Sequence, residues 1–151
     1  FDLLELLEDV SATVKPLADK QNNALHVHVE NSFDAVRSDE TRLRQILFNL
    51  LSNACKFTED GDVDLEARVS GQDDSRLITL EVRDSGIGMD EDELDRVFNS
   101  FTQADSSTTR RYGGTGLGLT ITAHLVDMLD GSIDVDSEPG VGTQFRVTLP
   151  A

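Results

Sequence analysis

The sequence predicts an α/β (α+β) two-layer sandwich, in which a mixed sheet of about five strands carries three helices on one face. Two observations support this fold class. Five short segments alternate apolar and polar residues, as strands with one buried face do. The longer helical segments gather their apolar residues on one side. Because polar residues fill the alternate strand positions, the other face of the sheet is expected to be largely open to solvent.

The length and charge of the chain limit its class. Its 151 residues can bury a core, and we expect residues 1–151 to form a single domain. The 29 acidic and 13 basic residues give a formal net charge of −16, which argues against general binding to nucleic acids or anionic membranes. No run of 18 apolar residues and no basic leader are present, so we expect a cytoplasmic domain. The single cysteine, Cys55, is expected to pack in a helix.

The first predicted element is a helix that begins at the start of the chain. Asp2 is its expected N-cap, and Glu5, three residues on, completes a capping box. Pro16 should kink this helix or end it early, because proline has no backbone N–H. Since Phe1 already lies at the helix start, we expect that the chain was cut from a longer protein. Apolar residues mark one face: Leu3, Leu6, Leu7, Val10, Val14 and Leu17.

A strand is predicted over residues 25–30, where apolar and polar residues alternate strictly. His26 and His28 share its polar face and could in principle bind a metal ion. Because no third ligand lies nearby in the sequence, we interpret both as solvated histidines.

The second helix is predicted over residues 40–57, with Asp39 as its N-cap. Asn49, Asn53 and Lys56 are spaced at i, i+4 and i+7 and therefore project in one direction. They form either a hydrated helix face or a ligand site. Asparagine is a poor choice for an exposed helix interior, which favours the ligand site. The opposite, apolar stripe consists of Leu43, Ile46, Leu47, Leu50, Leu51, Ala54 and Phe57.

Two further strands are predicted over residues 63–69 and 76–83, joined by a polar connection. The alternation that turns the apolar side chains of the second of these strands inward also turns Asp84 inward. A carboxylate on the buried side is costly unless it is hydrogen-bonded. Asp84 therefore either awaits a donor or bonds the backbone of the turn that follows it.

Residues 84–119 contain two glycine clusters, at 84–88 and 113–119, on either side of a polar segment. Grouped glycines leave backbone N–H groups free and let a ligand approach closely, which is typical of a phosphate-binding loop. Each cluster alone could be a pair of tight turns. Two clusters around the polar residues 102–112, with two amides and a lysine upstream, favour a nucleotide-binding site.

A short helix is predicted over residues 90–99, with Asp90 as its N-cap and Glu93 three residues on. Core packing accounts for Phe98 and Phe101 near its end, and these residues could also anchor the base of the polar segment that follows. The polar segment that follows has no periodicity, so we interpret it as either a functional loop or a surface excursion.

The last helix should begin near Gly116, with Gly131 at its C′ position. Its N-terminus would leave the second glycine cluster and could meet an anion. His124 is interpreted as a packed histidine on the apolar side of this helix. Strands over residues 133–135 and 143–149 complete the sheet. The expected apolar side consists of Leu117, Ile121, Leu125, Met128 and Leu129.

Neither glycine cluster matches a Walker A loop or a dinucleotide-binding fingerprint. The pattern instead resembles the ATP-binding domain shared by sensor histidine kinases, type II topoisomerases, Hsp90-type chaperones and MutL-type repair proteins, which implies a Bergerat-type fold. The motifs of the histidine-kinase branch occur in order over essentially the whole chain. They are an N box at 49–56, a first glycine box at 84–88, an F box at 98–101, a second glycine box at 114–119 and a terminal glycine box at 140–143.

The resemblance implies how ATP would be bound. Asp84 would accept a hydrogen bond from the exocyclic amine of adenine, and Gly86 and Gly88 would let the base approach. Asn53 and Asn49 would bind Mg²⁺ through their side-chain oxygens.

Further contacts are implied around the triphosphate. Lys56 would reach phosphate or ribose, and Arg110 or Arg111 would add positive charge near the phosphates. The second glycine box and the helix start would wrap the phosphates. The remaining residues expected to contact the nucleotide are Phe101, Gly114, Thr115, Gly116, Leu117, Gly118, Leu119 and Thr143.

The branches of this family separate at Asn49, where the ATP-hydrolysing relatives have a glutamate as general base. An amide has no useful basicity, so ATP should be held for another nucleophile. The resemblance implies that the γ-phosphoryl group passes to a histidine on a separate dimerisation domain, with Asn49, Asn53 and Lys56 as catalytic residues. None of the three histidines present has the phosphoacceptor motif.

The resemblance also implies partners. These are the dimerisation helices of the same protein and, indirectly, a response-regulator receiver domain. The isolated domain is expected to be monomeric and the full-length protein homodimeric, with any membrane anchor in absent segments. Two other functions stay open: a non-catalytic ATP-sensing interaction module, and an ATPase of the chaperone or topoisomerase branch. A protein-serine kinase of the same superfamily is a further alternative.

Overall fold

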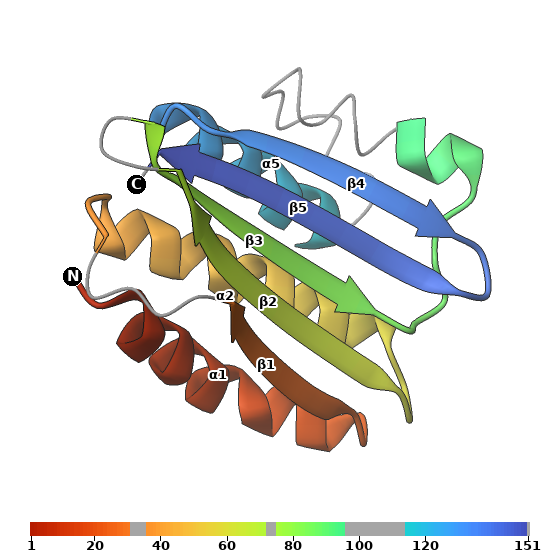
Figure 1. The fold of residues 1–151 in the computed structure, drawn as a ribbon. Coiled ribbons are helices and arrows are strands. Elements are labelled where there is room, and N and C mark those ends of the chain that lie inside the picture. The colour runs from red at the N-terminus through yellow and green to blue at the C-terminus, as the bar shows by residue number, and fades with distance from the viewer. Residues whose placement is uncertain (31–35, 72–74, 96–113, 151) are drawn as a thin grey trace.

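The computed structural model describes residues 1–30, 36–71, 75–95 and 114–150. Its described elements form the predicted two-layer sandwich, with helices on one face of a five-stranded sheet (Figure 1). Residues 91–95 form a further short helical segment. The helices are α1 (Leu3–Lys20), α2 (Glu40–Phe57) and α5 (Gly114–Met128). The strands are β1 (Ala24–Glu30), β2 (Asp62–Ser70), β3 (Leu77–Asp84), β4 (Ser132–Glu138) and β5 (Gly142–Pro150).

The sheet is mixed and has the strand order β1-β2-β3-β5-β4. Strand β1 runs parallel to β2, and all other neighbours are antiparallel. At the end of β3, Asp84 lies opposite Val63 on one side and Thr143 on the other. The register therefore places the start of β5 beside Asp84, although Asp84 and Thr143 are 59 positions apart in the sequence.

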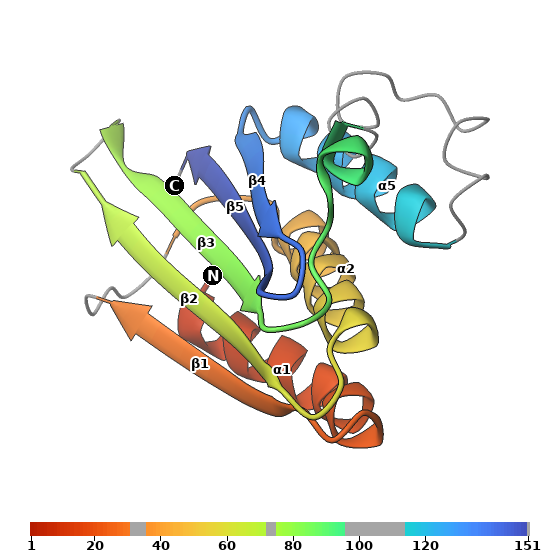
Figure 2. The same cartoon turned by 90° about the vertical axis from the view of Figure 1, so that its right-hand side faces the viewer.

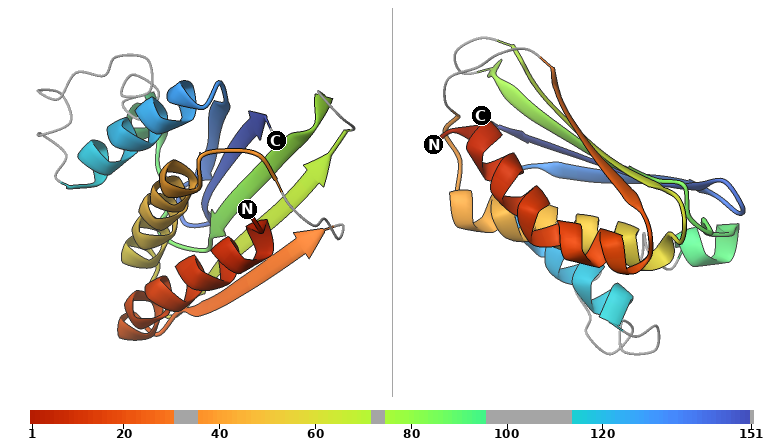
Figure 3. Two further views of the ribbon diagram at one scale, coloured as in Figure 1. Left: turned by 90° about the vertical axis from the view of Figure 1, so that its left-hand side faces the viewer. Right: turned by 90° about the horizontal axis from the view of Figure 1, so that it is seen from below.

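The core lies between the sheet and the helical layer formed by α1, α2 and α5 (Figure 3). The predicted stripes of α1 and α2 face this core, apart from Leu17, which is 39% exposed, and Phe57, which is half-buried. Cys55 is buried as expected. The largest fully buried side chains are Leu3, Leu6, Leu7, Leu43, Ile46, Leu47, Leu50, Leu51, Leu65, Ile78, Leu80 and Leu149.

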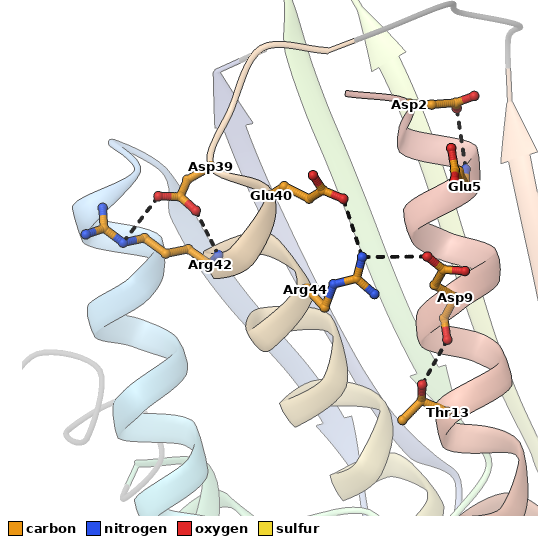
Figure 4. Close-up of polar contacts among 8 residues, drawn as sticks. All are labelled: Asp2, Glu5, Asp9, Thr13, Asp39, Glu40, Arg42 and Arg44. Carbon is orange, nitrogen blue, oxygen red and sulfur yellow. Dashed lines mark hydrogen bonds and ion pairs between the residues drawn. The ribbon is translucent and has the colours of Figure 1, made fainter.

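The three predicted N-caps are confirmed. Asp2 Oδ1 accepts from the backbone N–H of Leu4 at 3.0 Å. Asp39 and Asp90 each accept from the N–H three residues on, at 3.0 and 2.8 Å. These side chains satisfy N–H groups that have no partner within the helix. Figure 4 shows the first two caps, together with Arg44 of α2, which lies 3.6 Å from the carboxylate of Asp9 on α1.

Pro16 does not end the first helix, because α1 continues to Lys20. Proline removes the N–H that would bond the carbonyl of Ala12. Both residues are exposed, so water can reach that carbonyl. The helix ends at Lys20 with Gln21 as its C-cap, and Asn22 follows with a φ of 57°, the left-handed conformation typical of a helix C′ residue.

The predicted apolar side of α5 is right for Leu125 and Leu129 and wrong elsewhere on the described part of the helix. Ile121 is 37% exposed, Met128 is 52% exposed and His124 is exposed rather than packed. The side chains that face the core are Thr122, Leu125 and Val126, with Leu129 partly buried. The end of α5 also differs by one residue. Asp130, with φ 58°, is the C′ residue, and the N–H of Gly131 bonds the carbonyl of Val126 at 2.9 Å.

The open face of the sheet carries charged side chains, as expected. Glu81 on β3 contacts three arginines, with nitrogen–oxygen distances of 3.6 Å to Arg68, 3.9 Å to Arg83 and 2.9 Å to Arg146. His26 and His28 are exposed at the β1 edge, and the described residues contain no group of three or more His, Cys, Asp or Glu that could hold a metal ion. Within the described ranges, no helix combines the length and apolar character that a membrane span needs.

The turn between α1 and β1 braces the end of α2. The buried Asn23 side chain donates to the carbonyls of Cys55 and Thr58 at 3.1 and 2.8 Å, and it accepts from the N–H of Gly61 at 3.1 Å. Helix C-terminal carbonyls lack partners within their own helix. Asn23 therefore fixes the last turn of α2 and the loop that follows.

We expect Asn23→Ala to lower the free energy of unfolding by about 1–3 kcal/mol, because it leaves buried carbonyls unpaired. Urea unfolding of the chain measures this loss. Asn22→Gly is the matched control, since glycine tolerates the positive φ and the exposed Asn22–Asp60 hydrogen bond contributes little. The control should change stability by less than about 0.5 kcal/mol. An equal loss of unfolding free energy in both variants would contradict the role of the Asn23 side chain in fixing the end of α2.

Candidate functional site

Asp84 is the carboxylate around which the candidate site is built. It is half-buried at the end of β3, and its Oδ1 accepts from the N–H of Gly86 at 3.0 Å and from the N–H of Thr143 at 3.3 Å. The two interpretations of Asp84 therefore both apply, since it faces inward and also bonds its own turn. Both hydrogen bonds use Oδ1, so Oδ2 is the oxygen available to a further donor.

The environment of Asp84 disfavours its charge. Burial raises the pKa of the Asp84 carboxyl above that of an ordinary aspartate, while hydrogen bonding from Gly86, Thr143 and Thr58 lowers the pKa in part. Cys55 lies close by in α2, and burial, with a smaller contribution from the charge of Asp84, raises the pKa of its thiol to about 11. The Asp84 carboxylate thus gains from any additional donor that a ligand brings.

The turn after Asp84 packs against the end of α2. The N–H of Ile87 donates to the carbonyl of Phe57 at 3.3 Å, and Figure 2 shows this segment passing beside α2. A Cβ at Gly86 would collide with the Phe57 carbonyl and would lie 2.8 Å from Thr58 Oγ1. Only glycine fits here, because the turn packs closely against the end of α2. The expected approach of a base to Gly86 stays a prediction.

Gly88 has a φ of +70°, and a Cβ there would collide with the carbonyl of Glu138. This glycine therefore packs the segment after β3 against the β4–β5 hairpin. It lies beyond Gly86 along the turn, and its backbone is shaped by protein contacts. Its predicted contact with the base stays a prediction.

The amides of α2 lie on the side of the helix that the sequence predicts. Asn49 and Asn53 are half-buried and Lys56 is exposed. The side-chain N–H of Asn49 donates to Thr122 Oγ1 of α5 at 3.4 Å, a long contact that leaves the amide oxygen free to accept or to bind a cation. Among the described residues, none hydrogen-bonds the Asn53 amide. The Lys56 ammonium lies 5.7 Å from the centre of the Phe57 ring.

Thr143 and Ser137 join the start of β5 to the segment after β3. The hydroxyl groups of Thr143 and Ser137 lie 2.8 Å apart, and Ser137 Oγ accepts from the N–H of Met89 at 2.7 Å. Thr143 was expected at the site, whereas Ser137 and Thr58 were missed. A period-two pattern puts Thr143 beside Asp84 only once the strand register is known, and nothing local singles out Ser137 or Thr58.

Helix α5 begins two residues before its predicted start, and the phosphate contacts expected of the second glycine box stay a prediction. Residues Gly114–Leu119 lie in the first turns of α5, which begins at Gly114 rather than near Gly116. Helical hydrogen bonding leaves only the N–H groups of the first turn free for an anion. The predicted contacts of Phe101, Arg110 and Arg111 lie outside the described residues.

A surface hollow of about 510 Å³ adjoins Asp84 and Thr143 from the open face of the sheet. Within the described part of the chain, none of Asn49, Asn53 and Lys56 borders it. The meeting of Asp84 with the α2 amides around one ligand therefore stays a prediction. The hollow is lined by Asp62, Asp64, Arg83, Asp84, Ser85, Asp136, Ser137, Glu138, Val141, Gly142, Thr143 and Gln144.

The chain is similar to known proteins over nearly its whole length. Residues 38–151 match the family described as "Histidine kinase-, DNA gyrase B-, and HSP90-like ATPase". The autoinducer 2 sensor kinase/phosphatase LuxQ of Vibrio parahaemolyticus is 46% identical over 156 residues, which cover 99% of this chain and 18% of LuxQ. The sensor histidine kinase RcsC of Escherichia coli is 39% identical over 151 residues, covering 99% of this chain and 16% of RcsC.

Solved structures have the same fold. Full-length ShkA in complex with AMPPNP is 35% identical with a TM-score of 0.80, over 99% of this chain and 30% of ShkA. The nucleotide-free catalytic domain of the histidine kinase ThkA is 25% identical with a TM-score of 0.78, over 99% of this chain and 92% of that domain. The sandwich fold, the turn in which the Gly86 N–H bonds Asp84, and the family match all indicate the same family. The chain therefore belongs to the family of histidine kinase-, DNA gyrase B- and HSP90-like ATPases, and within it matches the catalytic domains of sensor histidine kinases.

Proposed function

We propose that this chain is the MgATP-binding catalytic module of a sensor histidine kinase, which donates the γ-phosphoryl group of ATP to a histidine on a separate dimerisation domain. Given the family of the chain, one observation supports this function most directly. The half-buried Asp84 carboxylate stands where the end of α2, the Gly86 turn and the start of β5 meet. Its buried, acceptor-only character suits the exocyclic amine of a purine.

In this proposal Asp84 selects adenine. Its oxygen accepts from the amine at position 6 of the base, whereas a purine with a carbonyl there would place two acceptors face to face. Gly86 has no side chain, so the backbone of the turn can lie against the ring. The carboxylate is held by two backbone N–H groups and needs little reorganisation on binding.

The amides of α2 fit a Mg²⁺ ion by their chemistry. Mg²⁺ prefers oxygen ligands and is usually held by few protein groups together with the phosphates. Asn53 and Asn49 each supply an amide oxygen, and the Asn49 contact with Thr122 leaves that oxygen free. When bound, the ion would neutralise charge on the phosphates during transfer.

Positive charge near the triphosphate is required because the chain carries a formal net charge of −16. We propose that Lys56, exposed at the end of α2, supplies part of it. Arg110 or Arg111 and the first-turn N–H groups of α5 supply the rest. Asn49 in place of a general base slows attack by water, so ATP stays intact until the acceptor histidine arrives.

The chain spans less than a fifth of the length of LuxQ and RcsC, so the partners belong to the proposal. We propose that the acceptor histidine lies on dimerisation helices of the same protein. The full-length protein would then be a homodimer, with a receiver domain as the next phosphate acceptor. The catalytic domain itself would be monomeric and cytoplasmic.

Label transfer tests the proposed activity. The chain is mixed with a purified dimerisation domain of a LuxQ-type relative and with γ-labelled ATP and Mg²⁺, and the label is followed on the dimerisation domain. We expect label that is lost on acid treatment, as phosphohistidine is. A dimerisation domain with its acceptor histidine replaced by glutamine is the control and should stay unlabelled.

The alternatives give different results. ATP binding by calorimetry without any transfer would support a non-catalytic ATP-sensing module. Steady-state phosphate release by the chain alone would support an ATPase of the chaperone or topoisomerase branch, against the role assigned to Asn49. Acid-stable label would indicate a serine kinase.

A further inference from the structure

Thr58 carries a buried hydroxyl that the folded chain does not use. It is the C-cap residue of α2 and only 1% exposed, and its Oγ1 has no hydrogen-bond partner of full geometry. Its backbone is fixed, because its carbonyl accepts from the Asn23 side chain at 2.8 Å. A buried hydroxyl without a partner destabilises the fold, so its presence calls for an explanation.

The hydroxyl of Thr58 lies at the candidate site. Its Oγ1 would be 2.8 Å from a Cβ at Gly86, so it faces the backbone of the first glycine box. It is also near enough to Asp84 to lower the pKa of that carboxyl as a hydrogen-bond donor. Among the described residues, the other buried side-chain oxygen without a partner is Ser11 Oγ, which belongs to α1.

We propose that Thr58 is a positioning residue for base recognition: its hydroxyl donates to the Asp84 carboxylate and aims the carboxylate at the exocyclic amine of adenine. This inference rests on the proposed function. Two N–H groups already hold Oδ1 of Asp84. A third donor, from the side of α2, fixes the rotation of the carboxylate and supports its negative charge against burial. In this scheme the hydroxyl, which has no hydrogen-bond partner in the free protein, completes its hydrogen bond to Asp84 when the base binds.

The proposal predicts a loss of affinity only for ligands that contain the adenine base. Thr58→Val keeps the shape of the side chain and removes its hydroxyl, so ATP affinity should fall about tenfold, the size expected for a hydrogen bond to a charged group. Affinity for inorganic tripolyphosphate with Mg²⁺ should not change, because Thr58 does not contact the phosphates in this scheme. Thr58→Ser restores the hydroxyl and should restore ATP affinity.

Titration calorimetry of the wild-type chain and both variants, with MgATP and with magnesium tripolyphosphate, decides the matter. A melting curve of Thr58→Val should show a midpoint equal to or above that of the wild type, since the variant removes an unpaired buried hydroxyl. Lower stability with equal losses for both ligands would mean that Thr58 is only structural and would overturn the proposal. Unchanged ATP affinity in Thr58→Val would overturn it too, while leaving the proposed function intact. A wild-type chain that binds no ATP would refute the proposed function itself.

Discussion

Asp84→Asn should weaken ATP binding by about 10- to 100-fold, the loss expected when a hydrogen bond to a charged group is removed. The Asp84 oxygen that accepts from the Gly86 and Thr143 N–H groups would remain as the amide oxygen of asparagine. The amide NH₂ would then face the amine of adenine, and two donors would meet. Calorimetry with MgATP measures the loss.

Magnesium tripolyphosphate is the control ligand for this variant. It lacks the base, so its affinity should be the same for Asp84→Asn and the wild type. Equal losses for ATP and tripolyphosphate would count against adenine recognition by Asp84 and would indicate a general change in the site.

The same carboxylate predicts a pH dependence. Burial raises the pKa of Asp84, and protonation of Oδ2 would turn the oxygen that faces the adenine amine into a donor. Wild-type ATP affinity should therefore fall as the pH drops through this raised pKa, and the fall should be absent in Asp84→Asn. Cys55, the titratable neighbour in α2, has a pKa of about 11 and stays protonated throughout. A wild-type profile parallel to that of the variant would contradict the assignment.

The contribution of Asp84 to the stability of the fold should depend on pH in the opposite direction to its contribution to ATP affinity. The native state binds the Asp84 proton more tightly than the unfolded chain, so the contribution of this group to stability is present at low pH and is lost as the pH rises through the raised pKa. Without ATP, Asp84→Asn should thus gain stability relative to the wild type between acidic and neutral pH. Unfolding in urea at several pH values measures the difference.

Asn53→Ala should abolish the part of ATP affinity that depends on Mg²⁺. The alanine variant has no oxygen ligand at this position, so adding Mg²⁺ should no longer strengthen ATP binding. The fold should persist, because the Asn53 side chain is half-buried on the polar side of α2 and no described residue hydrogen-bonds it. Calorimetry with and without Mg²⁺ separates the two contributions.

Gln45→Ala is the matched control for Asn53→Ala, since Gln45 is an exposed amide on the polar side of the same helix. It should leave the effect of Mg²⁺ unchanged. If Asn53→Ala still shows the wild-type difference between the two conditions, the metal role of Asn53 is wrong.

Local rules were enough for much of the fold. Alternation identified the strands, and it turned Asp84 inward before the sheet was known. The caps at Asp39 and Asp90 followed from one polar residue before a helical pattern, since such residues bond an N–H three positions on.

The errors arose where local patterns give no single answer. Apolar residues surround much of α5, so several faces could be the buried one, and packing decided for Thr122, Leu125 and Val126. Pro16 was accommodated because Ala12, whose carbonyl it leaves without its helical partner, is an exposed residue. The parts of the site that were missed depend on long-range contacts. Met89 and Ser137, for instance, are 48 positions apart.

The Asn23 brace has a practical consequence for dissecting this protein. The family match begins at residue 38, whereas carbonyls at the end of α2 are held by a side chain 15 positions before that boundary. A fragment trimmed to the family limits would discard α1 and Asn23 and hydrate the final turn of α2. Weak nucleotide binding by such a fragment would then result from a frayed end of α2. Residues 1–30 must therefore be kept in any protein used to measure nucleotide binding.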